Sequence, residues 1–262
     1  ASGGREGLSP SRTLPKGGHG MGATTSFCRL RRVCLASAIA AVILAGLSGV
    51  ARAGCKPAEL IVAVDAGHGP KSPGATSASG QPEYAFNKRL AAKVRDALIQ
   101  AGFAKAFLID PVGKDLSPAG RAARANAAKA GLLISIHHDS AQPQFFTTAV
   151  IDGATRRVCD RFAGYGVFYS GRNRQAASSL ELAKAIGREL AASGLPFSPH
   201  HAADIPGEGR PIVDAAAGVY RYDGLAVLHA ANMPAALVEA GVIVNPAEEQ
   251  ALVTAARQTQ TA

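Results

Sequence analysis

Four side chains able to bind or use a metal ion stand where elements of regular structure are expected to begin or end. His68 follows an apolar segment directly and lies between two glycines, which allow a tight loop and leave the imidazole uncrowded. His137 and Glu239 close two later apolar segments, and Glu83 follows Pro82 at the start of a helical pattern. Two imidazoles and a carboxylate form a set that holds catalytic zinc and leaves one coordination position for water. The residue types therefore indicate zinc-dependent chemistry.

Several of these residues and their neighbours can also be explained without a metal ion. Glu83 could serve only as a favourable acid at a helix N-terminus, and Glu239 could belong to a structural ion pair, because an unpaired carboxylate in an apolar strand is costly. His137 and His138 are neighbours on an expected strand, so at most one of them should face a metal. Asp65 could orient a ligand histidine or simply cap the loop that follows it.

Strand and helix patterns alternate along the first part of the mature chain. The expected strands cover residues 59–65, 104–109 and 132–137, and the expected helices cover residues 83–101 and 118–131. Such an alternation predicts a single α/β domain with a twisted, mostly parallel sheet and helices on both faces. In such a sheet, ligands bind at the carboxyl ends of the strands, so we expect His68 and His137 to lie at the same rim.

The second part is less regular. Residues 142–165 are interpreted as an excursion from the core, and residues 196–222 as a long connection rich in proline, glycine and charge. The remaining expected elements are strands over residues 166–170, 225–230 and 235–239, a helix over residues 180–192, and a closing helix that begins at Asn245. The long connection holds polar residues that could contact a substrate or simply be solvated, namely His200, His201, Asp204 and Glu208.

The first 53 residues have the pattern of a leader. Arginines precede an apolar segment, and residues 51–53 read Ala-Arg-Ala, a typical cleavage site. We therefore expect residues 1–20 to be a disordered or misassigned upstream segment, residues 21–53 a signal peptide, and residues 54–262 the folded domain. The alternatives are an uncleaved transmembrane anchor and a lipoprotein attached at Cys55. Cleavage predicts a periplasmic or secreted protein without a stable membrane anchor.

The basic charge of the chain is concentrated in this leader. The formal net charge is +9, of which residues 1–53 carry +6 and the remaining residues +3. A domain with so small an excess of basic over acidic residues does not need a basic face, so we expect no nucleic-acid partner. Cys55 and Cys159 are the cysteines left after cleavage, and in an oxidising compartment they could form a disulfide or stay as buried thiols.

Several separated motifs, taken together, resemble a known family. In chain order they are Val64-Asp-Ala-Gly-His68-Gly, Ser72-Pro-Gly-Ala75, Glu83 with Asn87, Ile134-Ser-Ile-His137, and the segment from Pro234 through Glu239 to Asn245. This pattern, over roughly residues 60–252, resembles the zinc-dependent N-acetylmuramoyl-L-alanine amidases of the type-3 amidase family. Pro70 and Ser72 differ from the residues common in that family, but neither position is a zinc ligand.

The resemblance implies a cofactor, a substrate and a role for each site residue. It implies that His68, Glu83 and His137 bind Zn²⁺ and that Glu239 acts as general base and then as general acid. The implied substrate is peptidoglycan or muropeptides, cleaved between the lactyl group of N-acetylmuramic acid and L-alanine. Two alternatives stay open: a catalytically silent cell-wall binding or regulatory module on the same fold, and a zinc peptidase that cleaves another bond. The residues identify no activator protein.

Overall fold

The computed structural model describes residues 56–262. The predicted upstream segment and signal peptide lie outside the described residues, and so does Cys55. Cys159 is buried. Because Cys55 is not described, the disulfide between the two cysteines stays a prediction. Within residues 56–262, every helix is too short or too polar to cross a lipid bilayer.

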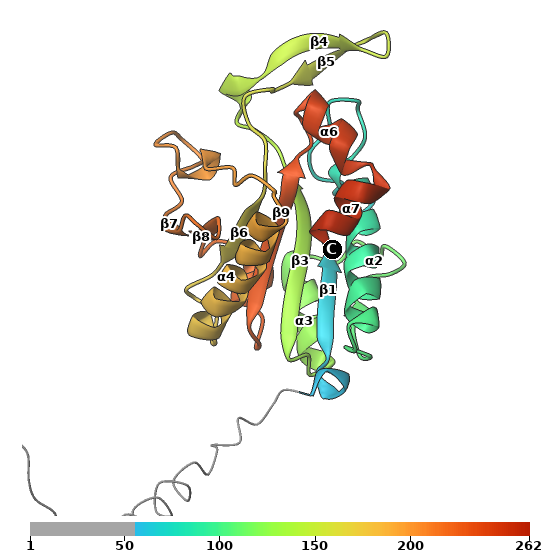
Figure 1. The fold of residues 1–262 in the computed structure, drawn as a ribbon, viewed down its shortest axis with the longest axis vertical. Coiled ribbons are helices and arrows are strands. Elements are labelled where there is room, and N and C mark those ends of the chain that lie inside the picture. The colour runs from blue at the N-terminus through green and yellow to red at the C-terminus, as the bar shows by residue number, and fades with distance from the viewer. Residues whose placement is uncertain (1–55) are drawn as a thin grey trace, which may run out of the picture. The chain divides into compact units, whose positions relative to one another are not determined.

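A seven-stranded sheet organises residues 56–262, with the order β2-β1-β3-β9-β6-β8-β7. Strands β2, β1, β3 and β9 run parallel, whereas β6 runs antiparallel to β9, β8 parallel to β6, and β7 antiparallel to β8 (Figure 1). The predicted mostly parallel sheet is therefore confirmed. The strands are β1 Val62–Ala66, β2 Phe107–Leu108, β3 Leu132–Asp139, β6 Gly166–Tyr169, β7 Ile212–Asp214, β8 Val219–Arg221 and β9 Ala235–Val242.

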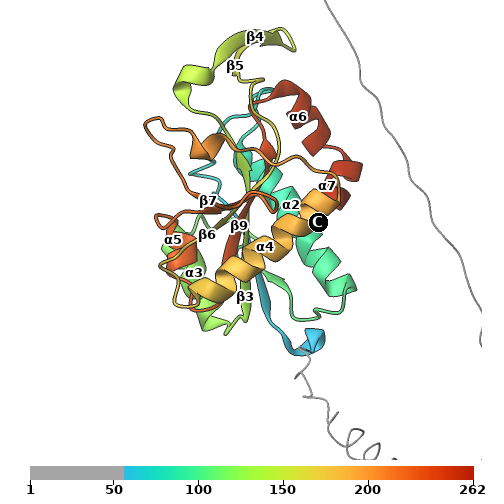
Figure 2. The same cartoon turned by 60° about the vertical axis from the view of Figure 1, so that its left-hand side comes forward.

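Helices pack on both faces of this sheet, as the sequence predicted. One buried cluster joins the sheet to α2 and α4, and a second joins the opposite face to α3 and α5 (Figures 1 and 2). The helices are α2 Glu83–Gln100, α3 Pro118–Ala127, α4 Ala176–Ala192, α5 Ala226–His229, α6 Pro246–Leu252 and α7 Ala255–Thr261. Short 3₁₀ helices cover Pro57–Glu59, Pro143–Phe145 and His200–Ala202.

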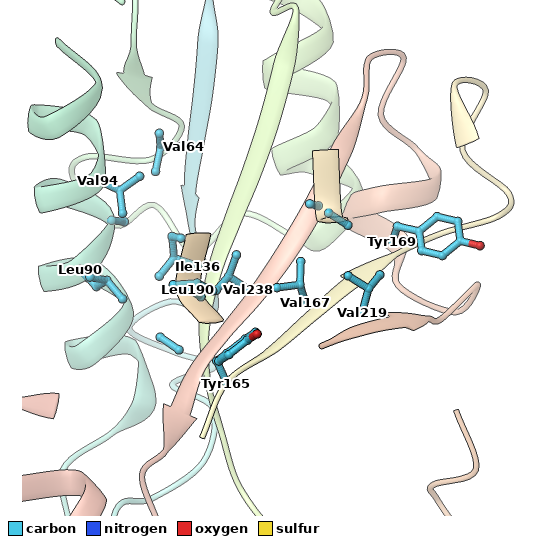
Figure 3. Packing of buried hydrophobic residues seen from close by; sticks show 14 of the residues in the cluster. Val64, Leu90, Val94, Ile136, Tyr165, Val167, Tyr169, Leu190, Val219 and Val238 are labelled. Atoms are coloured by element: carbon cyan, nitrogen blue, oxygen red, sulfur yellow. The ribbon is translucent and has the colours of Figure 1, made fainter. Parts of the chain in front are cut away.

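The larger buried cluster shows how these layers hold together. Figure 3 shows Val64, Ile136, Val238 and Val167 on four neighbouring strands, with Leu90 of α2 packed against the same layer. Burying one such side chain stabilises the folded state by about 1.5–3 kcal/mol. Because alternate residues of a strand point to opposite faces, Leu133 of β3 and Ala235 and Leu237 of β9 are turned toward α3 and α5.

Two predicted helix starts are confirmed by their caps. The hydroxyl of Ser117 accepts a hydrogen bond from the backbone N–H of Gly120, and Pro118 follows at the first helical position. The side chain of Asn245 accepts from the N–H groups of Ala247 and Glu248 at the start of α6. These polar side chains satisfy N–H groups that have no partner within the helix.

One element was predicted with the wrong structure. Residues 225–230 were expected to form a strand, but Ala226–His229 form helix α5. The segment buries the adjacent residues Val227 and Leu228 and then Ala231, a spacing that suits one side of a helix. An apolar run this short does not distinguish a helix from a strand by periodicity.

The excursion at residues 142–165 is confirmed, and it contains a hairpin that the sequence did not predict. Strands β4 Thr147–Ile151 and β5 Ala154–Val158 pair antiparallel in a separate two-stranded sheet. Figure 1 shows this hairpin beyond the end of the main sheet where β3 and β9 finish.

Candidate metal centre and active site

The loop after β1 places His68 at the rim of the sheet. His68 has a positive φ of 67°, an uncommon conformation for a residue with a side chain. Gly67 precedes it at a point where a Cβ atom would overlap the imidazole of His137. The glycine therefore allows the two histidine rings to approach, and their centroids lie 4.9 Å apart.

Glu83, the first residue of α2, joins the two histidines. Its Oε2 lies 3.1 Å from Nε2 of His68, and its Oε1 lies 3.1 Å from Nδ1 of His137. Asn87, one helical turn later, donates to Oε1 at 2.9 Å, and the backbone N–H of Ala75 donates to Oε2 at 3.1 Å. These contacts hold the carboxylate between the two rings.

The charge state of Glu83 suits a metal ligand. Burial on its own would raise the pKa of Glu83, but the hydrogen bonds and charges of His137 and His68 outweigh burial and lower it. The carboxylate is therefore ionised at neutral pH. One ligand atom from each of the three residues lies within 4.8 Å of the others.

This donor set fits a zinc ion. Two imidazole nitrogens and one carboxylate oxygen are a known catalytic set, with metal–ligand distances of about 2.0–2.2 Å. Donor atoms 3.1 Å apart have the separation that ligands arranged around such an ion would have. The structure thus brings together the three predicted ligands, while their binding of zinc stays a prediction.

His138 points away from this centre, as the alternation along a strand requires. Its Nδ1 lies 2.8 Å from Oδ1 of Asn87, and its ring packs against Phe86. Burial lowers the pKa of His138 to about 3, so the ring is neutral. His138 is thus buried beside Asn87, and it helps to position the amide that donates to Glu83.

Glu239 lies beside the centre within β9, directly opposite His137 in the adjacent strand. The strand continues to Val242, so Glu239 does not close it as the sequence suggested. Its Oε2 is buried and has no hydrogen-bond partner. Burial, together with the charges of Asp139 and Glu83, raises the pKa of Glu239 well above its ordinary value. An ion pair, the structural alternative, would have lowered this pKa.

Asp65 acts on the loop through another residue. Its Oδ2 accepts a 2.7 Å hydrogen bond from the hydroxyl of Ser135, and its Oδ1 lies 3.6 Å from Nε of Arg121. Arg121 in turn donates to the backbone carbonyl of His68. Asp65 thus contacts neither ligand ring, but it positions the arginine that holds the His68 backbone in place.

A cavity of about 540 Å³ opens beside His68 and His137. Its wall also includes Arg121 of α3 and Leu237 of β9, and it continues along the segment before α5. Leu237 and Glu239 are two residues apart on one strand, so they face the same side of the sheet. The predicted rim therefore brings together the three predicted metal ligands, a carboxyl group whose Oε2 has no hydrogen-bond partner, and a cavity.

Sequence reasoning missed a second cluster beyond the end of β3. Asp139, His200, His201 and Glu208 form a contiguous group of largely buried side chains, whereas the sequence placed the last three in a solvated or substrate-contacting loop. Burial alone would lower the pKa of His201, but hydrogen bonds to Asp139 and Glu208 raise it to about 9. A signal for Asp139 was present, because it follows His137 by two residues, the spacing for one face of a strand.

Comparisons with known proteins identify the family of the chain. Residues 62–262 match the model of the N-acetylmuramoyl-L-alanine amidase family. No curated protein matches the chain.

Several solved structures resemble the chain, among them three amidases. An amidase of this kind from Mycobacterium smegmatis aligns with a TM-score of 0.60 and 23% identity, over 78% of this chain and 91% of that chain. One from Clostridium difficile 630 aligns with a TM-score of 0.59 and 22% identity, over 77% and 90%. The catalytic domain of one from Bacillus (Paenibacillus) polymyxa var. colistinus aligns with a TM-score of 0.56 and 25% identity, over 77% and 91%. The first two structures are less than 25% identical to the chain, so their similarity shows the fold alone.

Proposed function

Because the chain belongs to the N-acetylmuramoyl-L-alanine amidase family, we propose that it hydrolyses peptidoglycan with the help of zinc. The bond cleaved joins the lactyl group of N-acetylmuramic acid to L-alanine. The observation that carries the proposal is the convergence of His68, Glu83 and His137 beside the unpartnered carboxyl group of Glu239. His68 and His137 line the cavity, which supplies a place for the muramyl peptide, and Glu83 and Glu239 lie next to these two histidines.

His68, Glu83 and His137 would hold the ion. When bound, zinc lowers the pKa of a water molecule and polarises a carbonyl group. Glu239 accepts the proton of the attacking water and later delivers it to the amine of L-alanine as the amide bond breaks. Its raised pKa suits both roles, because a carboxyl group that binds a proton more readily than usual can accept one and keep it until it is passed on.

The chain's own contacts keep this arrangement in place. Asn87 donates to Glu83 and also to the carbonyl of Gly67, so it joins the start of α2 to the loop that carries His68. Arg121 holds that loop from the other side. Such positioning matters because loss of a supporting contact typically costs 10- to 100-fold in metal affinity or activity.

We place the protein in the periplasm or outside the cell, since its substrate is the cell wall and residues 21–53 have the pattern of a signal peptide. Peptidoglycan or its muropeptide fragments are the partner that this function requires. Nucleic acid has no part in the proposal.

Digestion of purified sacculi by the purified protein, with mass analysis of the products, tests the function. We expect free peptides that begin with L-alanine and glycan strands that keep the lactyl group. His68→Ala should abolish the products, whereas His229→Ala, which removes an imidazole outside the centre, should leave them unchanged. Fragments cut between two amino acids would indicate a peptidase, and no products from a zinc-loaded, folded protein would indicate a silent wall-binding module.

A further inference from the structure

The second cluster gathers three potential metal ligands from two distant parts of the chain. Asp139 is the last residue of β3, and His200 and His201 begin the short helix His200–Ala202 in the long connection at residues 196–222. Nε2 of His200 lies 3.2 Å and Nε2 of His201 lies 2.7 Å from Oδ2 of Asp139. Two imidazole nitrogens therefore point at one carboxylate oxygen.

The other nitrogen of each ring is occupied by an orienting partner. Nδ1 of His200 lies 2.8 Å from the hydroxyl of Ser198, and Nδ1 of His201 lies 2.8 Å from Oε2 of Glu208. Histidines that bind metals in proteins almost always hold their second nitrogen in such a contact, which fixes the ring and its tautomer. Here both contacts aim Nε2 at the same point.

The cluster is largely closed to solvent. The side chains of His200, His201 and Asp139 are 3%, 13% and 12% exposed. Phe162 stacks on the ring of His200 with centroids 4.7 Å apart, and Phe168 meets the ring of His201 edge-on. Nε2 of His200 is buried without a hydrogen-bond partner, because its close contact with Asp139 lacks hydrogen-bond geometry. A buried nitrogen without a partner is costly unless something else satisfies it.

We propose that Asp139, His200 and His201 bind a second divalent metal ion of the zinc class. The set of two imidazole nitrogens and one carboxylate oxygen suits zinc better than calcium or magnesium, which prefer oxygen ligands. The ion gives Nε2 of His200 the partner that the protein itself does not provide. It also fastens the long connection to the end of β3, two residues beyond His137.

The competing interpretation is a network of ion pairs without a metal. In that network a protonated His201 joins the carboxylates of Asp139 and Glu208, and Arg210 pairs with Glu208. The network accounts for His201 but leaves Nε2 of His200 buried and unsatisfied. A metal ion accounts for both histidines, with Glu208 retained as the orienting partner of His201.

Counting bound metal tests the proposal without reference to turnover. The purified protein is loaded with Zn²⁺, freed of excess ion, and analysed by mass spectrometry of the metal alongside the protein concentration. We expect two zinc ions per chain in the wild type and one each in His68→Ala and His201→Gln. The variant that carries both substitutions should hold none. His229→Ala serves as the matched control and should keep two, because His229 belongs to neither metal group.

Asp139→Asn provides a second variant, since it keeps the size of the side chain and removes only the charged ligand. Circular dichroism identifies any variant that fails to fold, and the count from the other second-cluster variant then decides. One zinc per wild-type chain, lost in His68→Ala and kept in both second-cluster variants, would overturn the second site and leave the proposed function intact. Two zinc ions in both His201→Gln and Asp139→Asn would overturn it equally. A wild-type protein that binds two zinc ions per chain but does not digest sacculi would instead refute the proposed function and leave the second site intact.

Discussion

Replacing Glu239 with glutamine should stabilise the metal-free protein against unfolding. The same substitution should abolish hydrolysis by the zinc-loaded protein. Burial and two neighbouring carboxylates raise the pKa of Glu239 above its ordinary value of 4.5. The native protein therefore binds more protons at this site than the unfolded chain does, and its stability falls as the pH rises above 4.5. Glutamine has nearly the same shape but carries no charge, so it removes this penalty.

The size of the effect follows from the pH interval. Between the ordinary pKa of 4.5 and pH 7 there are about 2.5 units, and each unit is worth 1.36 kcal/mol, so the gain at pH 7 is at most about 3.4 kcal/mol. The gain should vanish below pH 4.5, where both states are protonated. For a domain of this size, 1 kcal/mol changes the Tm by roughly 2–4 °C. Loss of the general base should reduce turnover by about 100- to 10,000-fold.

The assay is denaturant unfolding of both proteins in a chelator at pH 4 and pH 7, with turnover measured on zinc-loaded samples of the same preparations. The chelator is needed because a bound cation would favour the ionised carboxylate. Glu248→Gln is the matched control: this buried carboxylate accepts hydrogen bonds from Gly164 and Val242 and contacts Arg257. Its substitution should lower the free energy of unfolding by about 1.5–3 kcal/mol. A Glu239→Gln protein that is less stable than wild type at pH 7, or equally stabilised at both pH values, would refute the reasoning.

Two further substitutions test the framework around the site. Gly67→Ala should lower zinc content and turnover together, because the added methyl group would overlap the ring of His137; an unchanged metal count would show that the loop can adjust. Asn173→Ala should lower the free energy of unfolding by about 1–3 kcal/mol without loss of zinc, since its amide donates to the buried carbonyls of Leu228 and Met233 at 2.7 and 3.1 Å. Thermal unfolding of Asn173→Ala and wild type measures this difference in stability. Equal unfolding midpoints would contradict the prediction.

The parallel half of the fold could be predicted from the sequence for a physical reason. Strands β1 and β3 and helix α2 have strong local patterns, and a parallel sheet brings the carboxyl ends of its strands to one rim. That rule was enough to expect His68 and His137 close together. Glu83 could be added only from the family resemblance, because an acidic residue at a helix start has a sufficient structural explanation of its own.

The second cluster could not be predicted in the same way. His200 and His201 lie in a connection without a regular pattern, so no periodicity relates them to β3. Their burial depends on how residues 196–222 fold over the sheet, which is a property of tertiary packing. Strand β6 was predicted, but its antiparallel direction was not, and the hairpin of β4 and β5 was missed; both depend on the connections between strands rather than on a local pattern.

The position of β9 has a consequence for the order of folding. This strand comes last in the chain among the strands, yet it lies in the middle of the sheet between β3 and β6. Until it is in place, the β2-β1-β3 group and the β6-β8-β7 group have no shared hydrogen bonds within the sheet. Completing the sheet therefore requires contacts of long sequence separation, which slow folding. A chain that emerges from its N-terminus first, from a ribosome or a translocation channel, would keep its sheet open until Ala235–Val242 had followed, and Glu239 would join the three predicted ligands only at the end.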